Sequence, residues 1–589
     1  LRRYNLATTP GVDPLTVVAP ALVVGGLAVV ALRSIPLLAR AGAGLATRSP
    51  GMPLAWGGWQ VARRVHGQGG AILLIVLAMS MGSMALAQSS TTERALIDQS
   101  GFEAGAPLRV GVGPELYGAT WLNAAYARIG GAPDRAMAAY RETVQVGGRA
   151  GVTFLGVGQD PGAVVDIRSD LVEGSWRALT AELRSHATAS AGIAIPGSPQ
   201  QLTLRIKVSV PPEVSVGFNS VTGTAILRDA SGLWSAIPTG PLAVDGPEDF
   251  VLRLDSPSGS PGYPLSLVGL SVDSGLFSWL SAEDMGGFQV QVLAATADGN
   301  PVPGLDRLTR SMSGPSLVLS APLPRVDSVP VIVTRRVADI ARQPVGGSFG
   351  FSVGGGRVQA TIVGIVEALP TATVPDLGVV ADLPTLQLAL ANPAGEGAGI
   401  RALSPREWWL APADPDAARA ALARAPRLQA SVADAGAILA ARRDASVNAG
   451  MRATMRLVTA AALVLAALGF AAATAAAGAA RRHDGVILAA LGMPPRTLRR
   501  VLVLERVTVI VLAVTVGLAA GGFAAGLVAA LLVGGDGHPQ VPPVRTVAQP
   551  VTLALFAGCV AVALTLVAAV VLSRTEKDLS GALRAGDRP

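Results

Sequence analysis

Five long apolar stretches set the organisation of this chain. They cover about 14–32, 70–87, 457–480, 507–533 and 551–572. A helix needs about 20 apolar residues to cross a bilayer, so each stretch is long enough for one membrane span. Between the second and third stretches, from 101 to about 448, the chain consists of short segments separated by glycine, proline and serine. The pattern therefore predicts five spans and one large domain outside the bilayer.

Arginine is concentrated in two of the segments that connect the spans. Five arginines and no acid lie within 33–64, and six arginines accompany two acids within 481–506. Short loops rich in Arg or Lys stay on the cytoplasmic side of a membrane. Both segments are therefore expected in the cytoplasm. Counting spans from them places residues 89–453 outside the cytoplasmic (cell) membrane, in a multi-pass protein.

The large domain shows two different patterns. From Gln201 to Val210 apolar and polar residues alternate strictly, which is typical of a half-buried strand, and turn-forming clusters such as 256–262 separate further strand candidates. We therefore expect a β-sandwich at 199–313. On either side an α/β pattern is expected, with a strand at 329–333, a helix at 335–341, a hairpin around Gly354–Gly356 and a helix that begins after Asp414.

The composition excludes several classes of function. Half of the 589 residues are hydrophobic, and the formal charge of +7 comes almost entirely from arginine beside the spans, so it does not predict nucleic-acid binding. Neither of the two lysines follows a glycine, so no phosphate-binding loop exists and any ATPase must be a separate partner. The spans contain almost no ionisable groups, which argues against an ion-coupled carrier.

Candidate catalytic and metal-binding residues are few. The four histidines lack the spacing of metal ligands, the single cysteine lies inside an apolar stretch, and we expect no cofactor and no metal. Residues 346–350 fit G-x-S-x-G, with Ser348 as the serine, but a β segment follows where a nucleophile elbow needs a helix. An exterior hydrolase therefore remains a third and weak alternative, and we expect no enzyme.

The arginine-rich loop carries a resemblance to a known family. It reads RRHDGVILAALGMPPRTLRRVLVLER from 481 to 506 and lies between two apolar stretches. In this position it resembles the cytoplasmic loop of the FtsX/MacB-type permeases of ABC transporters, in which a basic pair and an acid precede a Leu-Gly motif and a short helix that ends in Glu. Here Asp484 and Gly485 stand where the family usually has Glu.

The resemblance implies a fold class and a division into domains. It implies a membrane protein with a five-span α-helical transmembrane bundle and a large extracytoplasmic α+β porter-like domain, interrupted by the β-sandwich insertion. The expected divisions are a connecting helix and linker at 1–52, an elbow helix and first core span at 53–88, porter-like halves at 89–198 and 314–453 around the sandwich at 199–313, and an FtsX-like transmembrane domain at 454–589. The extra first span implies the C-terminal part of a longer two-unit permease.

The resemblance also implies a partner and the residues that contact it. A separate ABC-type ATPase would dock on the loop, through Arg481, Arg482, Asp484, Leu491, Gly492, Met493, Pro494, Arg496, Arg499, Arg500 and Glu505. From spacing alone, Gly517, Gly521, Gly522 and Gly526 form two G-x-x-x-G pairs that favour close helix packing in lipid. Generic small-residue content explains these glycines equally well.

The expected function is that of a permease subunit, in which ATP hydrolysis by a partner moves the extracytoplasmic domain, for export or mechanotransmission. Further partners would be the lipid bilayer, a missing N-terminal permease unit or second permease copy, and an extracytoplasmic protein or lipoprotein. A membrane-anchored binding or sensor protein without an ATPase is the alternative. The cargo and the ligand of the sandwich stay open.

Overall fold

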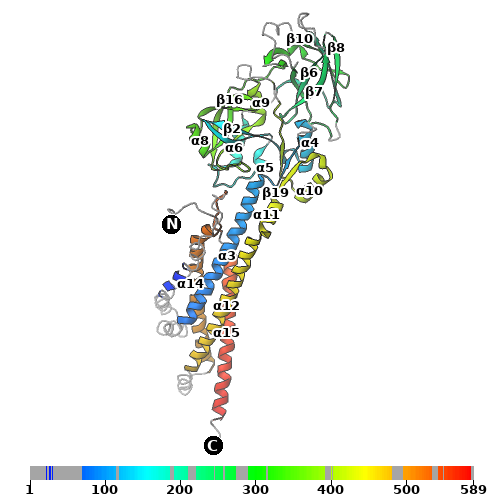
Figure 1. Cartoon of the computed structure of the whole chain (residues 1–589). Coiled ribbons are helices and arrows are strands. Elements are labelled where there is room, and N and C mark those ends of the chain that lie inside the picture. The colour runs from blue at the N-terminus through cyan, green and yellow to red at the C-terminus, as the bar shows by residue number, and fades with distance from the viewer. Residues whose placement is uncertain are drawn as a thin grey trace. The chain divides into compact units, whose positions relative to one another are not determined.

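The chain forms two compact units in the computed structural model (Figure 1). The structure describes residues 22, 25–27, 29–30, 33, 69–113, 118–158, 160–185, 191–209, 220–244, 246–255, 259–273, 289–313, 316–391, 400, 402–480, 495–533, 541–547 and 549–585. We call Leu1–Asp98 with Ala441–Pro589 the helical unit, and Gln99–Ala440 the sheet unit.

Four long helices run alongside one another in the helical unit (Figure 1). They are α3 (Gly69–Ala104, whose last turns belong to the sheet unit), α12 (Ser446–Ala480), α14 (Pro495–Val533) and α15 (Pro550–Ala585). Among the described residues, these four are long and apolar enough to cross a membrane. They correspond to four of the five predicted spans. The predicted first span and the elbow helix at 53–64 lie largely or wholly outside the described residues.

Helix α3 is the centre of this bundle. In its most apolar section 61% of the residues are buried, against 17% in both α12 and α15. Side chains of α3 such as Ile75 and Met79 share one core with Phe470 of α12 and Ile510 of α14. The outer faces of α12 and α15 instead expose leucine and valine, as expected for helix surfaces that contact lipid.

A nine-stranded mixed sheet forms the framework of the sheet unit. Its strands, in their order across the sheet, are β15 (Ser348–Val353), β16 (Gly356–Val366), β14 (Val329–Thr334), β17 (Gly378–Asp382), β3 (Arg149–Val157), β2 (Ala136–Val146), β18 (Glu407–Leu410), β1 (Leu108–Gly111) and β19 (Ser431–Asp434). Two pairs, β14 with β16 and β17 with β3, are parallel, and the others are antiparallel. The strand, helix and hairpin predicted at 329–366 are confirmed.

Helices and apolar side chains cover both faces of this sheet. Alternate residues point to opposite faces, so Trp408 belongs to one core and its neighbour Trp409 to another, and both are fully buried. The helices of the sheet unit are α4 (Ala119–Gly130), α5 (Pro161–Val164), α6 (Trp176–Ser185), α8 (Arg335–Ala341), α9 (Leu383–Leu390), α10 (Pro415–Arg424) and the first part of α11 (Ala435–Asp444), with 3-10 turns η2 (Pro133–Arg135), η4 (Leu305–Arg307) and η5 (Pro426–Leu428). Asp414 caps α10, as predicted.

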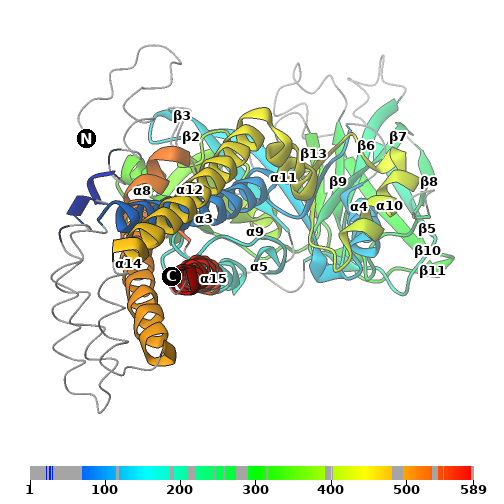
Figure 2. The same cartoon turned by 90° about the horizontal axis from the view of Figure 1, so that it is seen from below.

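Two further sheets lie between β3 and β14 in the sequence. One has four strands, β11 (Asn300–Pro301), β10 (Gln289–Ala297), β5 (Gln201–Ser209) and β8 (Pro247–Arg253). The other has β12 (Thr309–Ser313), β13 (Ser316–Ser320), β9 (Ser266–Asp273), β6 (Ser220–Arg228) and β7 (Trp234–Ala243), with β4 (Ile193–Ala194) beside β9. Both sheets contribute to one core, so they form a sandwich (Figure 2). The strand predicted from the alternation at 201–210 is β5.

Helix α4 joins the sandwich to the nine-stranded sheet. Trp121 packs into the sandwich core, and its indole nitrogen donates a 2.6 Å hydrogen bond to the Leu254 carbonyl. One position further, Leu122 belongs to the core of the large sheet, and Tyr126 stacks on Trp408 there. Helix α4 therefore connects the sandwich to the large sheet through two apolar faces.

Candidate functional site

Helices α3 and α14 approach each other closely at two glycines of α14. A Cβ atom on Gly517 would lie 2.5 Å from the Met79 Cβ, and one on Gly521 would lie 1.9 Å from the Ser83 Oγ and 2.5 Å from the Ser80 carbonyl oxygen. Such distances leave no room for any side chain. The absence of a Cβ therefore brings the two backbones into contact, which is how helices gain packing energy in lipid. We call this contact the glycine seam.

A polar side chain ties the glycine seam together. The hydroxyl of the fully buried Ser80 donates to the Val76 carbonyl on its own helix, at 2.7 Å, and lies 3.1 Å from the Gly517 carbonyl of α14. Ser83, also fully buried, donates to the Ser80 carbonyl at 3.2 Å. Because both hydroxyls find acceptors, the glycine seam carries polar groups without exposing them to lipid.

The other two predicted glycines behave differently. Gly522 and Gly526 have no heavy atom within 4 Å of the place where a Cβ would lie. Close packing is therefore seen at the first G-x-x-x-G pair, and the second pair meets no neighbour among the described residues. Two glycines that the sequence analysis did not select also lie at close contacts between helices. The Phe556 ring of α15 packs against Gly82, and Leu74 of α3 packs against Gly469.

Most of the residues predicted to contact the ATPase lie outside the part of the chain that the structure describes. Arg481, Arg482, Asp484, Leu491, Gly492, Met493 and Pro494 lie outside the described residues. Arg496, Arg499 and Arg500 belong to the first turns of α14, whose backbone is described there and whose side chains are not. Glu505 is buried, at 2% exposure. The predicted docking site therefore stays a prediction.

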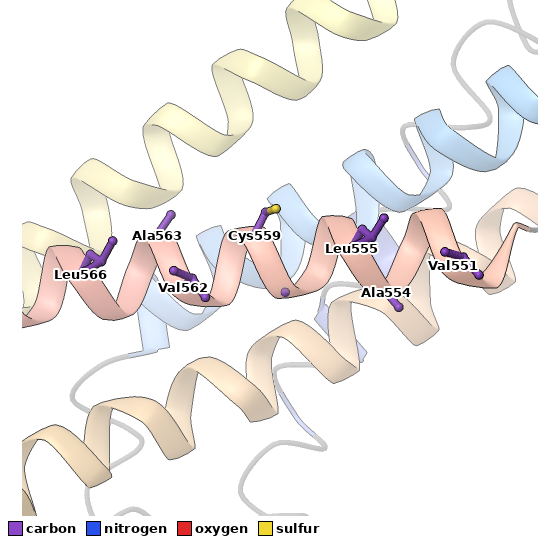
Figure 3. A pocket seen from close by; sticks show the side chains of 8 residues that line it. Val551, Ala554, Leu555, Cys559, Val562, Ala563 and Leu566 are labelled. Atoms are coloured by element: carbon purple, nitrogen blue, oxygen red, sulfur yellow. The ribbon is translucent and has the colours of Figure 1, made fainter.

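An open groove runs along one face of α15, and its lining is apolar (Figure 3). All of its lining residues belong to that helix, and they are Val551, Ala554, Leu555, Gly558, Cys559, Val562, Ala563 and Leu566. None carries a charge or a hydrogen-bonding group other than the thiol. This face is suited to lipid chains or to another apolar helix.

Beyond the apolar part of α3, polar groups replace glycine contacts. The hydroxyl of Ser90 donates to the Val547 carbonyl at 2.7 Å, and Thr91 accepts the Val547 amide at 3.1 Å. Glu93 then forms an ion pair with Arg443 of α11. Three consecutive polar contacts thus attach α3 to the segments beside it where the helix becomes too polar for lipid.

In the sheet unit, α3 and α11 connect directly to neighbouring strands. Only three residues separate the end of α3 from β1, and β19 ends at Asp434, next to the first residue of α11. β1 pairs with β19 from Leu108↔Asp434 to Gly111↔Ser431. We call this region, where the two helices meet the sheet, the junction. Any displacement of either helix there acts on a hydrogen-bonded pair of strands.

Asp434 fixes the start of α11. Its carboxylate accepts the amides of Gly436 and Ala437 and forms a two-point ion pair with Arg419 of α10. The hydrogen bond from Arg419 lowers the pKa of Asp434 below its usual value, and the two amides act in the same direction. The carboxylate is therefore held in its charged form, which suits the positive end of a helix dipole.

Glu407 is the charged centre of the junction. Arg141 binds it with two hydrogen bonds of 2.7 and 3.1 Å, the Trp409 indole donates at 3.1 Å, and Arg109 approaches to 3.6 Å. Burial by itself raises the pKa of Glu407, but the hydrogen bonds and charge of Arg141, with smaller help from Trp409 and Arg109, outweigh it and lower the pKa. Glu407 is thus a charged anchor between β2, β18 and β1.

The junction residues were missed by the sequence interpretation. Arg141, Thr371 and Glu407 lie more than thirty residues apart and match no short motif. The only local signal is an acid beside two tryptophans at 407–409, since a charge next to a buried strand must be paired.

The hydrolase alternative gains no support at Ser348. This serine begins β15, and its hydroxyl lies 3.1 Å from that of Thr361 on β16. A nucleophilic serine needs a base within hydrogen-bond reach. Within the described part of the chain, no three His, Cys, Asp or Glu residues gather in a way that could hold a metal ion.

The comparison with protein families concerns the helical unit. A family model described as FtsX-like permease C-terminal matches residues 456–577, which include most of α12, the loop after it, α14 and most of α15. No curated protein matched the chain. FtsX-like permeases are transporter subunits rather than typical enzymes, and they generally work with ABC ATPase subunits. With the four apolar helices, the match to 456–577 confirms the resemblance to FtsX-like permeases, and the matched part of this membrane protein is similar to their C-terminal domain.

Proposed function

We propose that this chain is the permease subunit of an ABC transporter in which a separate ATPase moves the sheet unit. The ATPase docks on the loop from Arg481 to Arg506, and its opening and closing tilts α12 and α14. Helices α3 and α11 pass that motion to the sheet. The sheet unit lies outside the cytoplasmic membrane, and the output is export or mechanotransmission.

The observation that carries the proposal is the direct connection of α3 and α11 to adjacent strands. A helix that ends in a long flexible linker cannot transmit displacement, because the linker absorbs it. Here three residues join α3 to β1, and none separates β19 from α11. The glycine seam supports the same idea, since it holds α14 to α3 without flexible side chains between them.

The docking is tested by replacing Leu491, Gly492, Met493 and Pro494 with serine in the full chain. Co-purification of the ATP-binding subunit is expected to be lost. The same replacement at 537–540, in the loop that follows α14, is the matched control and should leave the complex intact. Unchanged co-purification of the 491–494 variant would remove the docking claim.

The alternative function is that of an anchored exterior binding protein without an ATPase. What favours it is the sandwich, which has its own core between its two sheets. The two functions make opposite predictions for a purified complex. If no ATP-binding subunit co-purifies, and no gene for one lies beside this gene, the alternative is the better account.

A further inference from the structure

One residue near the end of α3 has an unfavourable backbone conformation. Three non-glycine residues among those described have positive φ angles, namely Asp298 at 48°, Arg342 at 54° and Thr371 at 62°. Asp298 precedes Gly299 in the turn between β10 and β11, and Arg342 closes α8, so both occupy positions where this conformation is common. Thr371 follows Pro370 in a turn, but it is β-branched, and a β-branched residue is strained in this region.

Three hydrogen bonds hold Thr371 in this conformation. Its amide donates to the Phe102 carbonyl in the last turns of α3, at 3.2 Å. Arg141 donates to its carbonyl at 3.0 Å and to its hydroxyl at 2.7 Å. Gly105 provides the space, because a Cβ there would lie 2.5 Å from the Thr371 methyl group.

These contacts form a continuous path from α3 into the sheet. Phe102 is bound to Thr371, Thr371 to Arg141, and Arg141 to Glu407 through two hydrogen bonds. From Glu407 the path reaches β18 and, through Arg109, β1. Every step is a direct contact, and the residues come from one helix, one loop and three strands.

We propose that Thr371 is a positioning residue that passes displacement of α3 to the sheet through Arg141 and Glu407. The proposal rests on the proposed function, since it names the residue through which the motion reaches the sheet. It does not follow from family membership, because the matched residues 456–577 do not include this loop.

The reason for threonine here is its narrow choice of conformations. A glycine at 371 would adopt left-handed and right-handed backbone angles at similar cost, so the loop could rearrange and absorb a shift of α3. Threonine has no comparable alternative nearby, and its hydroxyl gives Arg141 a second point of attachment. A shift of Phe102 therefore pulls Arg141 instead of reshaping the loop.

The test compares the wild-type chain with three variants in lipid nanodiscs. Thr371→Gly removes both the hydroxyl and the backbone strain, and Thr371→Ala removes the hydroxyl but keeps a Cβ atom in the strained conformation. Thr373→Gly, two residues further in the same loop, is the matched control, because Thr373 does not have a positive φ. Each chain is reconstituted with its co-purified ATPase, with and without ATP and orthovanadate. Thermal unfolding and hydrogen exchange of peptides from β2 and β18 are measured.

The expected result separates strain from coupling. Thr371→Gly should melt about 1–2 °C above Thr371→Ala, because both lack the hydroxyl and only alanine keeps the strain, and Thr373→Gly should melt below the wild type. In the wild type and in Thr373→Gly, ATP with orthovanadate should change exchange in β2 and β18. In Thr371→Gly this nucleotide-dependent difference should disappear, although the ATPase remains bound.

Two results would overturn the proposal while leaving the proposed function intact. A melting temperature of Thr371→Gly at or below that of Thr371→Ala would show that no strain is stored. An unchanged nucleotide-dependent difference in Thr371→Gly would show that the motion travels by another route. If the wild type itself shows no nucleotide-dependent difference in the sheet unit, the proposed function fails, and this inference fails with it.

Discussion

The glycine seam and the junction both hold neighbouring elements together, but they do so by opposite means. At the glycine seam, α14 is held to α3 by the absence of side chains, with two serine hydroxyls as its polar groups. At the junction, the strands are held by long charged side chains around Glu407. Lipid offers no hydrophobic driving force between helices, so close backbone contact is what remains. In contact with water, burial already drives packing, and a charged network can fix the positions of the strands.

The comparison predicts its largest effect at the glycine seam. Gly521→Leu places side-chain atoms where the Ser83 hydroxyl and the Ser80 carbonyl now lie. Overpacking in a close contact costs about 1–3 kcal/mol or more, and here both obstacles are fixed on a helix. We expect most of the protein to be lost as aggregate on size-exclusion chromatography in detergent. Gly522 is next to Gly521, and in the described part of the chain nothing lies within 4 Å of its Cβ position, so Gly522→Leu should elute as the wild type does. Equal behaviour of both variants would contradict the assignment of the glycine seam.

At the junction, removing the central charge should be nearly as costly. Glu407→Ala leaves Arg141 and Arg109 without their common acceptor, although the side chains of all three are no more than 26% exposed. Breaking a buried ion pair costs about 3–5 kcal/mol, and partial exposure reduces this to about 2–3 kcal/mol. Chemical unfolding of the full chain, followed by tryptophan fluorescence, should show this loss. A loss below about 0.5 kcal/mol would mean that the network is solvated.

A buried acid of the sandwich allows a test by pH. Asp229 accepts hydrogen bonds from Ser231 and Leu233 with one carboxylate oxygen, and the other oxygen has no hydrogen-bond partner among the described residues. Burial, opposed by these hydrogen bonds, raises its pKa from 3.8 to about 6. Because the folded state then holds a proton that the unfolded state releases, stability should increase as the pH falls from 7 to 4.5, by about 2 kcal/mol.

Asp229→Asn isolates this contribution. Glu407 and Asp434 have lowered pKa values, so their contributions change with pH in the opposite direction and are common to both proteins. On acidification the wild type should therefore gain unfolding free energy relative to the Asp229→Asn variant. A difference that stays constant with pH would show that Asp229 titrates normally.

The smallest effect is expected at an exposed ion pair of the same unit. Arg335 contacts Glu173 and Glu367, and the side chains of all three are 45% exposed or more. Exposed pairs contribute about 0–1 kcal/mol. Glu173→Ala should therefore change the unfolding free energy by less than about 0.5 kcal/mol in the same assay as Glu407→Ala. A cost as large as that of Glu407→Ala would remove the distinction between buried and exposed networks.

How far the sequence predicts this fold depends on whether the pattern is local. The spans α12, α14 and α15 could be predicted from the length of their apolar stretches, and β5 could be predicted from its strict alternation of apolar and polar residues. In each case the pattern is local, because each face of the element lies in a single environment. Helix α4 was missed, since Trp121 and Leu122 are adjacent yet serve different cores, which removes the one-sided pattern of an amphipathic helix. The sheet order cannot be predicted from such patterns, because its strands come from both sides of the sandwich.

The candidate site shows the same limit. Gly517 and Gly521 could be picked out by their spacing, but the spacing alone did not distinguish them from Gly522 and Gly526, which contact no described residue at the Cβ position. Only the position of α3 decides which pair is used. Thr371 carries no signal in sequence at all, since its φ angle results from Arg141 and Phe102, both more than 200 residues earlier.

The pairing of β1 with β18 and β19 also has a consequence for biogenesis. About 300 residues separate Leu108 from its partners Leu410 and Asp434, so the first strand is synthesised long before the strands on either side of it. The intervening sandwich can close on itself first, since its strands pair among themselves. Contacts between distant parts of a chain form slowly, and an unpaired strand invites aggregation while it waits. Arrested chains that end before residue 434 should therefore expose β1 to chaperones and proteases.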